Sequence, residues 1–218
     1  MQLSFLQKTA SHFFPVKVRK GAGTQNPVLE LFFYKGQWQL ATKDAIYSDG
    51  DRYRPLKLAF GKIKNRLSEA KNILILGTGL GSAVNILDTM GFHPQMDLVE
   101  IDQTVIDWAQ ELLPVSSLKR IHFFNDDAAV FIERNKKPYD VIVADIFESR
   151  IVPEFVTGRS FLEHCKNSLS AKGVFILNYM ISDTKKWGVF QQIFIEIFPE
   201  NKMYELGINR VMVADCSI

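Results

Sequence analysis

Apolar runs of strand length alternate with helix-like segments over residues 72–198, and this alternation limits the folds that the chain can adopt. The runs NILIL, MDLV, IHFF, VIVA and VFILN are apolar over most successive positions, as in strands with both faces buried. Helical segments separate them, which predicts a parallel sheet covered on both sides. The segment MYELGINRVMVADC contains two further strand-like runs around Gly207 and predicts an antiparallel hairpin at the end of the sheet.

The first 54 residues have a different pattern. Their apolar positions come in short bursts, HFFPVKV, VLELFFY and QWQLAT, separated by Gly, Pro, Asn and Lys. Such bursts are typical of small antiparallel strands and turns. We therefore expect a small N-terminal β region at residues 1–54 and a Rossmann-like domain at residues 55–218.

The amino-acid composition limits the kinds of molecule that the protein is expected to bind. The formal net charge of the 218 residues is +2, which gives no electrostatic reason to bind nucleic acid, so we expect a small-molecule partner. No stretch stays apolar for the roughly 20 residues of a membrane span, and the opening residues lack a signal-peptide core, which predicts a cytoplasmic protein with no membrane partner. Two cysteines and four scattered histidines predict neither a disulfide framework nor a metal site.

A glycine-rich turn, ILILGTGLGSA, joins the first predicted strand of the main domain to a helix. Gly77, Gly79 and Gly81 allow a sharp turn and let backbone N–H groups approach a ligand. In the dinucleotide fingerprint the third glycine comes one residue later, where this chain has Ser82. The spacing favours an S-adenosyl ligand over NAD.

Acidic residues follow the next three predicted strands. Glu100 comes about twenty residues after the loop, where an acid can accept both hydroxyls of a ribose. After the third strand we expect one acid of a pair to cap the following helix and Asp127 to face the ligand. Because the carboxyl ends of parallel strands share one crevice, we expect an acidic site suited to a sulfonium and an amine, made by Glu100, Asp102, Asp126, Asp127, Asp145 and Glu148.

These motifs resemble the spermidine synthase family of aminopropyltransferases, which have the class I methyltransferase fold. The similarity runs from about Leu29 to the C-terminal hairpin through ILILGTGLGSA, DLVEID, NDDAAVFI and YDVIVADIFES. It implies transfer of a propylamine group from decarboxylated S-adenosylmethionine to a diamine such as putrescine, with release of methylthioadenosine. In some family members the N-terminal strands pair across a dimer, so a homodimer is left open.

The resemblance also implies roles for individual residues. Glu100 would hold the ribose and Asp127 the adenine, while Gln39 would touch the cofactor. Asp145 would deprotonate the attacking amine. Glu148 would assist it and Tyr47 would help to close the site, with Tyr47 and Tyr179 as candidate hydrogen-bonding neighbours of the reacting groups.

Two departures from the family pattern keep alternatives open. The glycine loop has Leu80 where the family has an acid that binds the aminopropyl amine, and D-I-F-E replaces D-S-S-D after the fourth strand. The second departure is similar to the divergent spermidine synthase-like branch. The alternatives are a methyltransferase that uses intact S-adenosylmethionine on a small molecule, and a catalytically inactive adenosyl-binding module.

Overall fold

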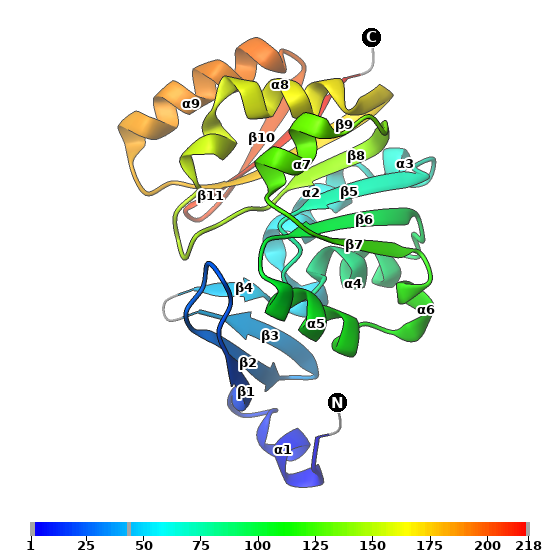
Figure 1. Cartoon of the computed structure of the whole chain (residues 1–218), viewed down its shortest axis with the longest axis vertical. Helices are drawn as coiled ribbons and strands as arrows, with labels where there is room; N and C mark the ends of the chain where they lie inside the picture. Colours follow the sequence, from blue (N-terminus) through cyan, green and yellow to red (C-terminus); the bar gives the residue numbers. More distant parts are fainter. Residues whose placement is uncertain (1–2, 43–44, 217–218) are drawn as a thin grey trace.

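The structure, a computed structural model, describes residues 3–42 and 45–216 and contains two separate sheets. Within the described residues the smaller sheet has four antiparallel strands in the order β1-β2-β3-β4. Their bounds are Val16–Gly21 (β1), Leu29–Tyr34 (β2), Gln37–Ala41 (β3) and Ile46–Ser48 (β4). A short helix, α1 (Phe5–Ala10), precedes them and extends away from the rest of the molecule (Figure 1).

The larger sheet forms the centre of the molecule and, over the same described ranges, has seven strands in the order β10-β11-β9-β8-β5-β6-β7. Strands β7, β6, β5, β8 and β9 are parallel, and β11 and β10 add an antiparallel hairpin at one edge. The bounds are Asn72–Leu76 (β5), Gln95–Glu100 (β6), Ile121–Asn125 (β7), Tyr139–Ala144 (β8), Leu169–Met180 (β9), Asn201–Leu206 (β10) and Asn209–Asp215 (β11).

Helices cover both faces of this sheet (Figure 1). One face packs on α2 (Arg54–Lys62), α3 (Lys64–Leu67), α4 (Ser82–Thr89), α5 (Gln103–Leu112) and α6 (Val115–Leu118). The other packs on α7 (Ala128–Arg134), α8 (Arg159–Asn167) and α9 (Thr184–Ile197). Two 3₁₀ helices, η1 (Gly50–Arg52) and η2 (Glu154–Thr157), complete the described elements.

The strand residues alternate between the two layers, as the pleat requires. In β5, Ile73 and Ile75 point into one core, and Leu74 and Leu76 into the other. Both faces of the central strands are therefore buried, which explains why their runs are mostly apolar. The predicted Rossmann-like sheet, its antiparallel C-terminal hairpin and the small N-terminal β region are all confirmed.

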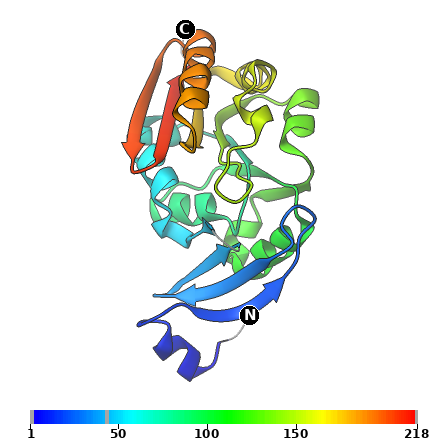
Figure 2. The ribbon, with the colours of Figure 1, turned by 90° about the vertical axis from the view of Figure 1, so that its left-hand side faces the viewer.

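The smaller sheet packs against the carboxyl-end side of the larger one, as the two perpendicular views show (Figures 1 and 2). Its buried Leu29, Leu31 and Leu40 form a third core with Val105 and Trp108 of α5. Leu80 of the glycine loop also belongs to this core. The packing places strand β4 and the loop between β1 and β2 over the ends of the parallel strands.

Strand order reverses between β5 and β8, since the chain runs from β5 to β6 and β7 on one side and then returns to β8 and β9 on the other. In open α/β sheets, ligands bind outside the carboxyl ends of the strands at such a reversal. Along the described ranges, no helix has both the length and the apolar character needed to cross a bilayer.

Candidate active site

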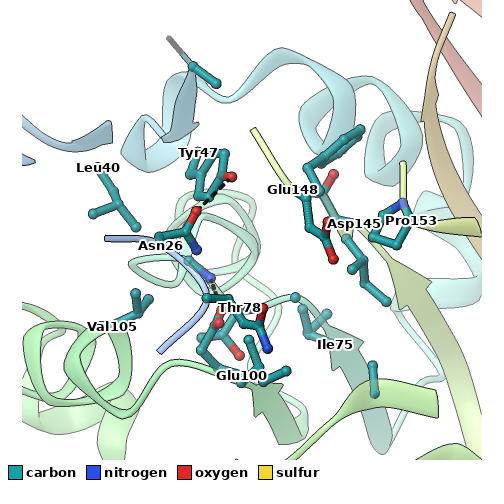
Figure 3. Close-up of a pocket in the computed structure, with 18 of the residues that line it drawn as sticks. Asn26, Leu40, Tyr47, Ile75, Thr78, Glu100, Val105, Asp145, Glu148 and Pro153 are labelled. Carbon is teal, nitrogen blue, oxygen red and sulfur yellow. Dashed lines mark hydrogen bonds between the residues drawn. The ribbon is translucent and has the colours of Figure 1, made fainter. Parts of the chain in front are cut away.

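A cavity of about 570 Å³ lies at the carboxyl ends of the parallel strands. Residues that follow β5, β6, β7 and β8 line it, and strand β4 and the β1–β2 loop close it from the side of the small sheet. Figure 3 shows Glu100 and Thr78 on one side and Asp145 and Glu148 on another. The structure thus brings the predicted acidic strand ends together in one cavity, lined by Glu100, Asp126, Asp127, Asp145 and Glu148.

The glycine loop takes a backbone path that other residues adopt with difficulty. Gly77, Gly79 and Gly81 have φ values of 88°, 52° and 80°, in the left-handed region. Gly77 and Gly79 line the cavity. Gly81 does not, because it faces Leu113, whose Cδ1 would lie 2.9 Å from an added Cβ. The three glycines therefore have different surroundings, and of the three only Gly77 and Gly79 border the cavity.

Glu100 bridges the end of β6 and the glycine loop. Its Oε2 accepts hydrogen bonds from the backbone N–H groups of Thr78 and Gly79, each 3.2 Å away, and its Oε1 accepts one from Asp102 N at 3.2 Å. Burial raises the pKa of this carboxyl, and the N–H donors oppose that shift. The carboxylate is thus held against the glycine loop at the wall of the cavity.

The two acids after β7 differ from our expectation in one respect, which is the residue that caps the next helix. Asp127, not Asp126, is the N-cap of α7: its Oδ1 accepts from Ala129 N at 2.7 Å and from Val130 N at 3.3 Å. Asp126 pairs with Arg134, and its Oδ1 accepts from Asp127 N at 3.0 Å. The expectation that Asp126 would be the capping residue is wrong, because α7 begins one residue later. Both acids line the cavity.

Asp145 follows β8 directly and is held by two donors. Its Oδ1 accepts from the Tyr53 hydroxyl at 3.1 Å and from Asn178 Nδ2 at 2.8 Å. Burial raises the pKa of this carboxyl to about 6, although the two hydrogen bonds act to lower it. A carboxyl with a pKa of about 6 can exchange a proton near neutral pH, as a general base requires.

Tyr47 links the small sheet to the segment after β8. Its hydroxyl lies 3.1 Å from Asn26 Oδ1 and accepts a hydrogen bond from the backbone N–H of Ser149. Ser149 itself has a positive φ of 59°, in a tight turn between Glu148 and Ile151. The exposed Glu148 side chain points toward Asp145 at the cavity wall (Figure 3).

Besides Gly81, two predicted site residues are not among those that line the cavity. Gln39 is buried in β3, where its amide donates to Asp49 Oδ1 at 2.9 Å. Asp102 is fully buried under the β1–β2 loop, and its carboxylate accepts from Thr24 Oγ1 at 2.7 Å, Gln25 N at 3.0 Å and Asn26 Nδ2 at 2.9 Å. Asp102 fixes the loop that brings Gln25 and Asn26 to the cavity.

The neighbours of Asp145 are not among the residues expected from the sequence. They are Tyr53 and Asn178, whereas Tyr179 points away and stacks on Phe190 with ring centroids 5.0 Å apart. Adjacent strand residues face opposite sides, so a choice between Asn178 and Tyr179 depends on the strand's orientation. A usable signal existed, because Asn178 is a lone amide in the apolar run VFILNYM, and a buried amide needs partners.

Known proteins are similar to this chain in sequence and in fold. A family model described as the spermine/spermidine synthase domain matches residues 60–193, more than half of the chain. The chain belongs to this family. A polyamine aminopropyltransferase of Alkaliphilus oremlandii is 28% identical over 146 residues, covering 63% of this chain and 51% of the relative. One from Vibrio vulnificus is 30% identical over 151 residues, covering 66% and 50%. The chain thus spans about half the length of these relatives.

Solved structures support the fold of this spermidine synthase family member. Spermidine synthase from Thermotoga maritima superimposes with a TM-score of 0.72 at 18% identity, covering 93% of this chain and 73% of that one. A spermidine synthase in complex with the transition state analogue AdoDATO gives 0.71 at 17% identity, with 93% and 74% coverage. Human methyltransferase-like protein 13 in complex with SAH gives 0.62 at 22% identity, with 75% and 80% coverage.

Proposed function

We propose that this protein transfers an aminopropyl group from decarboxylated S-adenosylmethionine to a small amine, with a diamine such as putrescine as the first acceptor to test. The observation that carries the proposal is the position of Asp145. It lies in the same cavity as the glycine loop and Glu100, and burial raises its pKa to about 6. A base and an adenosyl-binding loop therefore border one reaction space.

The donor would lie along the glycine loop. The backbone at Gly77 and Gly79 approaches the cavity without side chains, and Glu100 would accept the ribose hydroxyls. Asp126 and Asp127 line the cavity on the β7 side, where Asp127 would accept from the adenine amino group. Together with Asp145 and Glu148, these acids favour a cationic donor and a cationic acceptor, since clustered carboxylates repel one another when no cation is bound.

The reaction is a nucleophilic substitution at carbon. The amine nitrogen attacks the CH₂ group bonded to the sulfonium, the S–C bond breaks, and sulfur keeps the electron pair to give methylthioadenosine. An alkylamine has a pKa of about 10, so it arrives protonated and unreactive. Asp145 would take the proton, and its raised pKa narrows the gap between base and amine. Glu148 would hold the ammonium before transfer, and Tyr47 would keep the segment after β8 in place.

Two features favour a second candidate, methyl transfer from intact S-adenosylmethionine. Leu80 replaces the acid that would bind the aminopropyl amine, and its side chain is buried in the core beneath the small sheet. Arg150 lines the same cavity, and a guanidinium is suited to the carboxylate that only the intact donor carries.

The test is to incubate the protein with decarboxylated S-adenosylmethionine and a panel of diamines and polyamines, and to measure methylthioadenosine release. We expect release with at least one amine. Asp145→Asn should lower turnover by about 100-fold or more while donor binding is retained. The matched control is Asp107→Asn, an exposed carboxylate on α5 outside the cavity. If no amine gives methylthioadenosine release, the proposal is wrong. Methyl transfer from intact S-adenosylmethionine would establish the second candidate.

A further inference from the structure

Asn178 occupies an unusual position for an amide. It is 1% exposed and lies near the end of β9, in the middle of the sheet. Its Nδ2 is 2.8 Å from Asp145 Oδ1 and 3.2 Å from the Tyr53 hydroxyl, which is itself 3.1 Å from Asp145 Oδ1. The three side chains form a closed triangle on one oxygen of Asp145.

A second amide continues this network away from the cavity. Asn209, the first residue of β11, donates from Nδ2 to Asn178 Oδ1 over 3.0 Å. Strands β11 and β9 are neighbours, and their register pairs Asn209 with Met180, two residues beyond Asn178. The hairpin that ends the sheet therefore reaches the neighbourhood of the base.

While Asp145 is ionised, the hydrogen atoms can be arranged in only one way that satisfies this triangle. An ionised Asp145 only accepts, a neutral Tyr53 donates one proton, and an amide donates through nitrogen and accepts through oxygen. Asn178 must point its NH₂ group at Asp145 and Tyr53, so its oxygen must face Asn209. If the Asn178 amide turned over, its oxygen would face the carboxylate and its NH₂ would face the NH₂ of Asn209.

We propose that Asn178 and Asn209 are positioning residues for Asp145, which hold its Oδ1 with a donor, stabilise the ionised carboxylate, and leave Oδ2 for the acceptor amine. This inference rests on the proposed role of Asp145 as the base. Neither amide touches the reacting atoms in this scheme. Asn178 acts directly on the carboxylate, and Asn209 acts by fixing which way the Asn178 amide points.

Electrostatics give the direction of the expected change. Burial raises the pKa of Asp145. The hydrogen bond from Asn178 is the stronger of two interactions that lower this pKa, and the hydrogen bond from Tyr53 is the weaker. Loss of the Asn178 donor should therefore raise this pKa further above 6. The base works when ionised, so the acid limb of the pH–rate profile moves to higher pH. The other ionisable side chains that line the cavity are Tyr47, Tyr53, Glu100, Asp126, Asp127, Glu148 and Arg150.

The experiment compares pH profiles of methylthioadenosine release for three variants. Asn178→Leu keeps the approximate side-chain volume and removes the hydrogen-bond donor. The acid limb of its pH–rate profile should move to higher pH by about one unit. Asn209→Asp, when ionised, removes the donor to Asn178 Oδ1 and adds a negative charge to the network, and both changes should shift the acid limb in the same direction. Asn209→Ala removes the bond without adding charge and should give a smaller shift in the same direction.

The matched control is Asn201→Asp, which makes the same substitution on the same hairpin. Asn201 bonds to Phe198 O at 2.7 Å and does not line the cavity, so its acid limb should stay at the wild-type pH. If the three variants lose rate equally at all pH values, the amides are structural only and the inference is wrong. If Asn178→Leu fails to fold, the two variants Asn209→Asp and Asn209→Ala still test the inference.

A second readout does not depend on turnover. The Asp145 carboxyl carbon, labelled with ¹³C-aspartate and assigned by its absence in Asp145→Asn, reports its titration midpoint by NMR. The midpoint should rise in the same order as the acid limbs. A shifted midpoint in a protein that releases no methylthioadenosine would remove the proposed function and keep the positioning role. An unshifted midpoint in an active enzyme would remove the positioning role and keep the proposed function.

Discussion

Gly77 lies against the backbone of Asp145, so that a Cβ added to Gly77 would stand 2.3 Å from the Asp145 carbonyl oxygen. The glycine loop and the candidate base therefore pack directly against each other. A glycine at this position serves the geometry of the base as well as the approach of a ligand to the loop. This contact and the left-handed φ of 88° exclude a larger residue for two separate reasons.

We predict that Gly77→Ala destabilises the protein and displaces the segment that begins at Asp145. The matched control is Gly91→Ala, with a similar φ of 81° and no atom within 4 Å of the added Cβ. The control should cost only the backbone strain, about 1–2 kcal/mol. Gly77→Ala should cost at least about 2 kcal/mol more, because the clash is with backbone. Urea unfolding measures both, and equal costs would show that the contact with Asp145 is unimportant.

Glu100→Gln should weaken binding of adenosyl ligands. The glutamine keeps an acceptor for the N–H groups of Thr78 and Gly79 but loses the negative charge that would strengthen hydrogen bonds from the ribose hydroxyls. We expect the dissociation constant for methylthioadenosine to rise about 10- to 100-fold, equivalent to about 1.4–3 kcal/mol. Isothermal titration calorimetry measures it, with the exposed Glu133→Gln as control. Unchanged affinity would place the ribose away from Glu100.

Asp97 stabilises the end of the sheet far from the cavity. It is 4% exposed and accepts from Tyr139 Oη at 2.6 Å and Lys137 Nζ at 2.7 Å. Burial acts to raise its pKa, but the hydrogen bonds from Lys137 and Tyr139 outweigh burial and hold the pKa below its usual range. Asp97→Asn should lower the free energy of unfolding by about 2 kcal/mol at pH 6.

The pH dependence of this loss has a definite sign. The folded pKa of Asp97 is depressed, so its contribution is complete above the unfolded pKa of about 3.9 and disappears as pH falls through the folded value. The stability difference between wild type and Asp97→Asn should therefore shrink below about pH 4. Denaturant titrations at pH 6 and pH 3 test this, with Asp107→Asn as the control. A difference that is constant with pH would exclude the charge as the cause.

Tyr47→Phe should loosen the segment after β8 without unfolding the protein. The hydroxyl is the acceptor for the backbone N–H of Ser149 and also contacts Asn26. Without it we expect the Ser149 amide to exchange about 10-fold faster with solvent, equivalent to about 1.4 kcal/mol of lost protection. Hydrogen exchange read by NMR gives the rate. Tyr34→Phe, in the same sheet and outside the cavity lining, should leave the Ser149 rate unchanged.

Much of the fold and part of the site follow from local chemistry in the sequence. Continuous apolar runs require strands buried on both faces, so the parallel sheet could be predicted before any contact was known. The glycine spacing and the acids at Glu100 and Asp145 follow the strands directly, and a parallel sheet brings its carboxyl ends to one edge. These features need only the order of elements along the chain.

Tertiary structure alone decided what each acid contacts. Tyr53, Asp145, Asn178 and Asn209 lie in four separate segments of the chain. Asp145, Asn178 and Asn209 meet because β8, β9 and β11 are neighbours in a fixed register, and Tyr53 joins them from the N-terminus of α2. Asp102 turns from the predicted ligand toward the β1–β2 loop, because that loop buries it and supplies three donors. Local pattern determines which carboxylates follow a strand, whereas the partners and the pKa of each carboxylate depend on the packing of distant segments around it.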